Sequence, residues 1–166
     1  MEDYASSLIS QYRTSGVLVD TNLLLLLYVG GYNRALVAKF RRTRTRFVTA
    51  DFDALRDLLD PVEKLVTTPY ILTEVSNLMG QLKPPAKAAC FRRFAQSIAA
   101  MHEDHTPSAE LAGKQTFVPL GITDTSILEV AAQPYLVLTQ DAPLYNRLAS
   151  RGIEVLNYNH IRPLDF

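Results

Sequence analysis

The sequence contains little of what marks several protein classes. It has one cysteine, Cys90, which cannot form a disulfide within the chain, and this is typical of proteins from a reducing compartment. Lysine plus arginine and aspartate plus glutamate each total 17, so no overall charge favours nucleic acid or a membrane surface. The apolar run at residues 23–29 is far shorter than the roughly 20 residues that a membrane helix needs.

Several motifs of targeting and catalysis are also missing. The first residues are acidic and polar, with no basic segment leading into an apolar one, so no signal peptide is expected. No G-x-x-x-x-G-K-[ST] loop is present, which disfavours nucleoside triphosphate hydrolysis. His102 and His105 have no further ligands at the spacing of a zinc site. We therefore expect a cytoplasmic protein with no membrane association.

Short apolar segments alternate with helical segments along the chain. The hydrophobic fraction of 48% suits one core, and we expect a single domain over residues 1–166. Strands are predicted at residues 17–19, 65–67, 135–139 and 153–156, and helices at residues 3–12, 22–28, 32–40, 51–59, 69–79, 84–101, 124–132 and 143–151. Glycines 30 and 31 are expected to break the second helix, and residues 102–113 to form a loop or short helix. This alternation predicts an α/β fold with a mainly parallel central sheet.

The first predicted strand, residues 17–19, ends at an aspartate. Asp20 follows it directly, and Thr21 or Asn22 can cap the helix that comes next. Ligands of α/β proteins bind in the crevice outside the carboxyl ends of the strands, where Asp20 is expected to lie. Asp20 therefore has two interpretations, a turn or cap residue and a catalytic carboxylate.

Three further acids stand beside buried segments. Glu74 lies within an otherwise apolar helix, Asp124 opens a helix, and Asp141 follows a strand. Each has a purely structural explanation: Glu74 facing solvent, Asp124 as a helix cap and Asp141 as a turn residue. Glu129 falls on a later helical turn than Asp124 and is predicted to face solvent rather than to join these acids.

In series, these segments resemble the PIN domain, the nuclease fold of the VapC toxins of bacterial toxin–antitoxin pairs. The resemblance is carried by V-L-V-D-T-N at the first strand, T-P-Y-I-L-T-E-V in the middle, I-T-D-T-S-I-L-E-V-A, and L-T-Q-D before a final short strand. It covers about residues 17–158. It implies a three-layer α/β/α domain with a central, mainly parallel sheet.

The resemblance also implies a metal-dependent endoribonuclease that cuts single-stranded RNA. By position, the acids that would bind Mg²⁺ or Mn²⁺ and carry catalysis are Asp20, Glu74, Asp124 and Asp141, with Asn22 and Thr139 as polar neighbours. The physics agrees, because Mg²⁺ prefers oxygen ligands and clustered carboxylates repel one another until a cation neutralises them. A bound ion can activate water and stabilise charge on a phosphate. The same resemblance implies an antitoxin partner and a homodimer.

One concentrated basic run precedes the predicted helix at residues 51–59. It contains Arg41, Arg42, Arg44 and Arg46, and lies in a stretch between Asp20 and Glu74 that is longer than in compact PIN toxins. It is either a solvated helix end or a set of contacts to RNA phosphates. Both interpretations stay open from the sequence.

Two other functions compete with the nuclease. An aspartyl phosphatase of the haloacid-dehalogenase type would need a second aspartate two residues after the first, but that position is Asn22, which cannot protonate a leaving group. A non-catalytic PIN-type module that binds RNA or protein would be expected to have lost acids, and this chain keeps Asp20 and its three counterparts.

Overall fold

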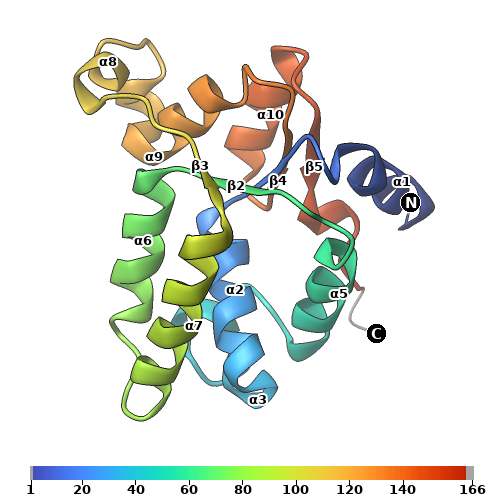
Figure 1. Ribbon diagram of the computed structural model, residues 1–166, viewed down its shortest axis with the longest axis vertical. Coiled ribbons are helices and arrows are strands. Elements are labelled where there is room, and N and C mark those ends of the chain that lie inside the picture. Colours follow the sequence, from blue (N-terminus) through green and yellow to red (C-terminus); the bar gives the residue numbers. More distant parts are fainter. Residues whose placement is uncertain (1, 164–166) are drawn as a thin grey trace.

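A computed structural model describes residues 2–163 of the chain, with side chains from Tyr4 onward (Figure 1). The predicted domain also includes residues 1 and 164–166, which lie outside the described residues. The strands are β1 (Val17–Val19), β2 (Leu65–Thr67), β3 (His102–Glu103), β4 (Leu136–Thr139) and β5 (Val155–Asn157). The helices are α1 (Glu2–Tyr12), α2 (Thr21–Tyr32), α3 (Arg34–Val37), α4 (Arg41–Arg44), α5 (Thr49–Leu59), α6 (Pro69–Met79), α7 (Ala86–Ala100), α8 (Ser108–Ala112), α9 (Phe117–Val130) and α10 (Ala142–Ser150), with a 3₁₀ turn at Tyr158–His160.

The central sheet has five parallel strands in the order β3-β2-β1-β4-β5. Strand β1 is in the middle, where Leu18 pairs with Val66 on one side and Val137 on the other. Helices flank the sheet, with α2, α6 and α7 on one side of the strands and α9 and α10 on the other (Figure 1). The predicted α/β class is confirmed. Since all strands are parallel, their carboxyl ends share one edge.

Helix α2 is the most deeply buried helix of the core, and it corrects one prediction. The helix continues through Gly30 and Gly31 to Tyr32 instead of breaking at the glycines. A Cβ added to Gly30 would lie 2.3 Å from the Phe52 ring, so the glycine lets α5 approach α2 closely. Close packing of the two helices thus outweighs the helix penalty of glycine, about 1 kcal/mol per residue.

Two other predictions differ from the structure. The helix expected at residues 32–40 is only the short α3, because Asn33 ends α2 and its side chain accepts from Ala35 N (3.0 Å) to begin a new turn. Residues 102–113, expected to form a loop or short helix, do contain the short helix α8, but they also contain β3, a two-residue exposed strand paired with β2 that was not predicted. Polar residues in so short a strand give no apolar pattern to detect. Within residues 2–163, no helix is long and apolar enough to cross a membrane.

Candidate functional site

Asp20 lies between β1 and α2, and its side chain forms hydrogen bonds both to α2 and to the end of β4. Its Oδ1 accepts from Leu23 N (3.0 Å) and caps α2, while its Oδ2 accepts from the Thr139 hydroxyl and from Gln140 N (2.9 Å) beyond β4. The side chain is buried, with 5% of the residue exposed. The cap interpretation is therefore confirmed. It does not exclude chemistry, because Oδ1 receives one protein hydrogen bond and keeps a second lone pair.

The Thr139 hydroxyl connects Asp20 to Asp141. It donates to Asp20 and accepts from the backbone N of Asp141 (2.9 Å), and the residue is fully buried. Asp141 in turn caps α10, since its Oδ1 accepts from Leu144 N (2.8 Å). The predicted place of Thr139 beside an acid is thus found in the structure. Asn22 is half-buried near Asp141, and within residues 2–163 it makes no hydrogen bond to an acid.

Glu74 and Asp124 reach the site from two helices tied to each other. The hydroxyls of Thr68 at the start of α6 and Ser126 in α9 lie 3.1 Å apart. Glu74 is exposed on α6, and its Oε2 accepts from the Thr21 hydroxyl (3.2 Å), next to Asp20. The prediction placed Asp124 at a helix start, whereas α9 begins earlier, at Phe117.

A kink in α9 explains that difference. Gly121 has φ +79° and ψ −179°, and it separates α9 into two helical segments. A positive φ of this kind is readily adopted by glycine alone. Asp124 lies three residues beyond the kink, in the first turn of the second segment, where the positive end of a helix favours a carboxylate.

Asp124 lies close enough to the other three acids to be influenced by their charges. Burial, followed by the carboxylates of Asp141, Glu74 and Asp20 in that order, raises the pKa of Asp124 to about 7. Burial also raises the pKa of Asp20, against the opposing hydrogen bonds from Thr139, Leu23 and Gln140. In the part of the chain that the structure describes, none of these four acids forms a salt bridge.

The donor set fits a hard divalent cation. Its ligand atoms are all carboxylate oxygens, which Mg²⁺ and Mn²⁺ prefer, and their mutual repulsion lacks a protein cation to relieve it. Among residues 2–163, no three histidine, cysteine, aspartate or glutamate side chains already converge on a common point as metal ligands do. Both oxygens of Asp20, one of Asp141 and one of the exposed Glu74 accept hydrogen bonds from protein donors, and in the described residues the other oxygens of Asp141 and Glu74 accept none.

The basic run is divided by the fold. Arg42 Nε donates to Gln81 Oε1 (2.7 Å), and Arg41 lines a pocket with the same glutamine that none of the four acids lines. Arg44 is exposed on α4. Arg46 lines a polar pocket of about 310 Å³, which we call the Arg46 pocket. Its lining residues are Asn22, Thr45, Arg46, Gln140, Asp141, Ala142, Asn159 and Arg162. Arg162 was not predicted, because a single arginine near the chain end carries no motif.

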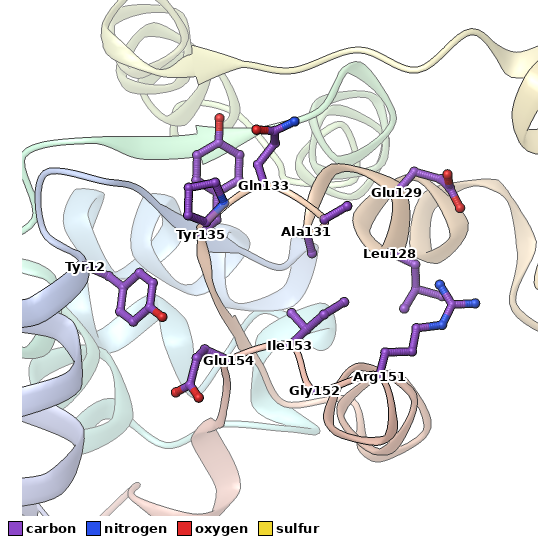
Figure 2. A pocket seen from close by; sticks show the side chains of 12 residues that line it. Tyr12, Leu128, Glu129, Ala131, Gln133, Tyr135, Arg151, Gly152, Ile153 and Glu154 are labelled. Atoms are coloured by element: carbon purple, nitrogen blue, oxygen red, sulfur yellow. The ribbon is translucent and has the colours of Figure 1, made fainter.

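A larger hollow lies at the opposite, amino-terminal edge of the sheet (Figure 2). It has a volume of about 530 Å³, and Tyr135 and Ile153 line it just before β4 and β5. Figure 2 shows Glu129 and Glu154 on opposite sides of this hollow. Glu129 lines this hollow and pairs with Lys114 (2.9 Å), so it lies apart from the four acids as predicted, although it is half-buried rather than fully exposed to solvent. None of the four site acids lines this hollow.

Comparisons with known proteins add no assignment to this geometry. No family model, curated protein or solved structure matches the chain. The functional argument therefore depends on the chemistry of the acid cluster at the carboxyl edge of the sheet, formed by Asp20, Glu74, Asp124 and Asp141.

Proposed function

We propose that the protein is a metal-dependent endoribonuclease whose active site is the acid cluster. The observation that carries this proposal is the position of Asp124 within reach of Asp141, Glu74 and Asp20 at the carboxyl edge of a parallel sheet, where burial and these carboxylates raise its pKa to about 7. Carboxylates kept this close without a protein cation are typical of sites that bind a metal ion. The choice of single-stranded RNA as substrate comes from the resemblance to the PIN-domain toxins.

Asp124, Glu74, Asp141 and the free lone pair of Asp20 Oδ1 are the groups that would hold Mg²⁺ or Mn²⁺. When bound, the ion would lower the pKa of a water molecule and stabilise charge on the phosphate being cleaved. The protein fixes the ligands: Thr139 and Gln140 orient Asp20, and Thr21 donates to Glu74. Such hydrogen bonds behind the ligands set their rotamers and their basicity.

The partners that we propose follow from the same resemblance. A toxin of this kind is held inactive by an antitoxin that inserts an arginine among the acids, and a guanidinium pairs well with clustered carboxylates. We also propose a homodimer. Expression of the active protein alone without harm to the host would count against the toxin role.

Cleavage of an end-labelled single-stranded RNA tests the enzyme. Wild type is expected to cut with Mg²⁺ or Mn²⁺ and not with EDTA. Asp124→Asn should lose about 100-fold or more of the rate, because it removes a ligand of the ion that would stabilise transition-state charge. Asp124 is the sharper target because its side chain makes no hydrogen bond in the described residues, whereas Asp20→Asn would also disturb the cap of α2.

Asp60→Asn is the matched control, because Asp60 is an exposed aspartate at the end of α5. It should cut RNA as wild type does. Equal cutting by wild type and Asp124→Asn, or cutting that persists in EDTA, would contradict the assignment. Binding of RNA without any cutting would instead indicate a non-catalytic RNA-binding module.

A further inference from the structure

The Arg46 pocket opens directly beside the acid cluster and shares Asp141 with it. We propose that this pocket binds one backbone phosphate of the single-stranded RNA, adjacent to the phosphate that is cleaved; this inference rests on the proposed function. Its volume of about 310 Å³ is at the small end for ligand sites, which suits a single phosphate and its sugar rather than a folded partner.

Arg162 forms the fixed wall of the pocket. Its Nε donates to Asp51 Oδ1 (2.9 Å), one terminal nitrogen donates to Asp51 Oδ2, and the other donates to the carbonyl of Arg46 (3.0 Å). A guanidinium has five N–H donors, so these bonds leave two of them for a ligand. Because Asp51 is fully buried, the guanidinium is held in place and presents those donors without a further loss of side-chain freedom.

Arg46 supplies the positive charge that is not neutralised. Its backbone is held by the bond from Arg162 and by its own N donating to Thr43 O (2.9 Å), and Phe47 beside it is buried. Its side chain is exposed, and across residues 2–163 it forms no salt bridge. A positioned backbone with an unpaired guanidinium is suited to a planar, bidentate contact with phosphate.

Two amide side chains complete the polar lining. Asn159 donates one N–H to the carbonyl of Gln140 (2.8 Å) and keeps a second donor. Asn22, in the first turn of α2, also lines the pocket. Neutral donors beside arginines are common partners of phosphate oxygens in nucleic-acid complexes. A strand bound with one phosphate at the acid cluster would place its neighbour against these donors.

The test distinguishes binding of RNA in this pocket from a general electrostatic attraction of RNA to the basic run. Binding of a labelled single-stranded RNA is measured in the inactive Asp124→Asn background, with Arg46→Gln, Arg44→Gln or Arg92→Gln added. Arg92 is the matched control, an exposed arginine on α7. Arg46→Gln should weaken binding roughly fivefold and reduce the salt dependence by about one phosphate, a slope change of about 0.7. Arg44→Gln should do less, and Arg92→Gln nothing.

Neutral phosphate analogues identify the phosphate concerned. A single methylphosphonate is moved along the RNA, and one position beside the cleaved bond should weaken binding to the Asp124→Asn protein and to its Arg92→Gln derivative. The same substitution should have no further effect on the Arg46→Gln derivative, because the contact is already gone. Arg162 is unsuitable for this purpose, since its removal would leave Asp51 buried without its cation.

The outcomes distinguish the pocket from the enzyme. If the protein cuts RNA but no methylphosphonate position shows an effect that depends on Arg46, the phosphate-binding role of the pocket is wrong and the nuclease proposal is unaffected. The same effect in a protein that never cuts RNA would support the pocket and reject the nuclease. Equal losses from Arg46→Gln, Arg44→Gln and Arg92→Gln, or no measurable binding of RNA, would overturn the pocket.

Discussion

Two aspartates of this protein are buried in opposite electrostatic settings. Asp51 is fully buried, and its carboxylate accepts from two nitrogens of Arg162 and from Val48 N (2.8 Å), so a protein cation neutralises it. Asp20 is almost as deeply buried, but its partners are a hydroxyl and two backbone N–H groups, and its pKa is raised by burial and, to a smaller extent, by Asp141. The first is built for stability and the second leaves a charge to be neutralised by something else.

The surroundings of each aspartate extend this difference. The backbone carbonyl of Asp51 also accepts from the Tyr158 hydroxyl (2.7 Å). Residues 158–162 are therefore attached to α5 around the Asp51–Arg162 salt bridge, in which the two charges neutralise each other. Asp20 stands with three more carboxylates, among them Asp124, whose pKa reaches about 7. A carboxylate cluster without its own cation costs stability, which is a common property of functional sites.

Removing the cation of the balanced pair should have the largest effect. Arg162→Met leaves Asp51 buried without a counter-charge, and we expect the free energy of unfolding to fall by about 3–5 kcal/mol in urea denaturation. The matched control is Arg34→Met, which breaks an exposed pair with Asp53 and should cost less than about 1 kcal/mol. Similar losses in both variants would show that burial of Asp51 adds nothing.

Removing the charge of Asp124 from the acid cluster should have the opposite effect and stabilise the protein. In EDTA, the folded protein keeps a proton on Asp124 up to about pH 7, whereas the unfolded chain loses it near the ordinary aspartate pKa of 3.8. The folded state binds more protons between these two pH values, so the free energy of unfolding should fall as pH rises from about 4 to 7 and stay low above pH 7. The expected fall is about 2 kcal/mol after solvent screening is taken into account.

Asp124→Asn should therefore unfold at higher urea than wild type at pH 8, and the gap should shrink at pH 5. Asp60→Asn, which removes an exposed charge, should not reproduce this pH-dependent gain. A variant at Asp124 that is less stable than wild type at pH 8 would mean that the acids do not repel one another.

Loss of one donor to Asp20 should have a smaller effect. Thr139→Val keeps the shape of the side chain but removes the hydroxyl that donates to Asp20 and accepts from Asp141 N, at an expected cost of about 1–2 kcal/mol. Because this hydrogen bond favours the charged form of Asp20, its loss should also move the acid limb of the cleavage rate to higher pH. Thr139→Ser keeps the hydroxyl and should restore the wild-type pH profile.

The sequence predicts the local part of the acid cluster well. Apolar strands that end in Asp20 and Asp141 are recognisable, and Pro69 marks the first turn of the helix that carries Glu74. These signals work because strand, cap and helix start are set by residues close together in the chain.

The parts that sequence patterns miss depend on contacts between distant residues. Asp51 and Arg162 are 111 residues apart, and neither carries a motif that announces their pairing. Helix α2 continues through Gly30 because Phe52, from another helix, fills the space that a side chain would need. Lys114 draws Glu129 into a salt bridge in the same way. Periodicity cannot report such tertiary partners.

Direct binding of Mn²⁺ tests the central claim most closely, since it depends on neither the RNA sequence nor a partner. Titration calorimetry at pH 7.5 (about half a unit above the pKa of Asp124) would compare wild type, Asp124→Asn and Asp60→Asn. We expect wild type and Asp60→Asn to bind Mn²⁺ alike, and Asp124→Asn to bind at least about tenfold more weakly. Equal affinity of all three proteins, or no binding by wild type, would contradict the assignment of the acid cluster as a metal site.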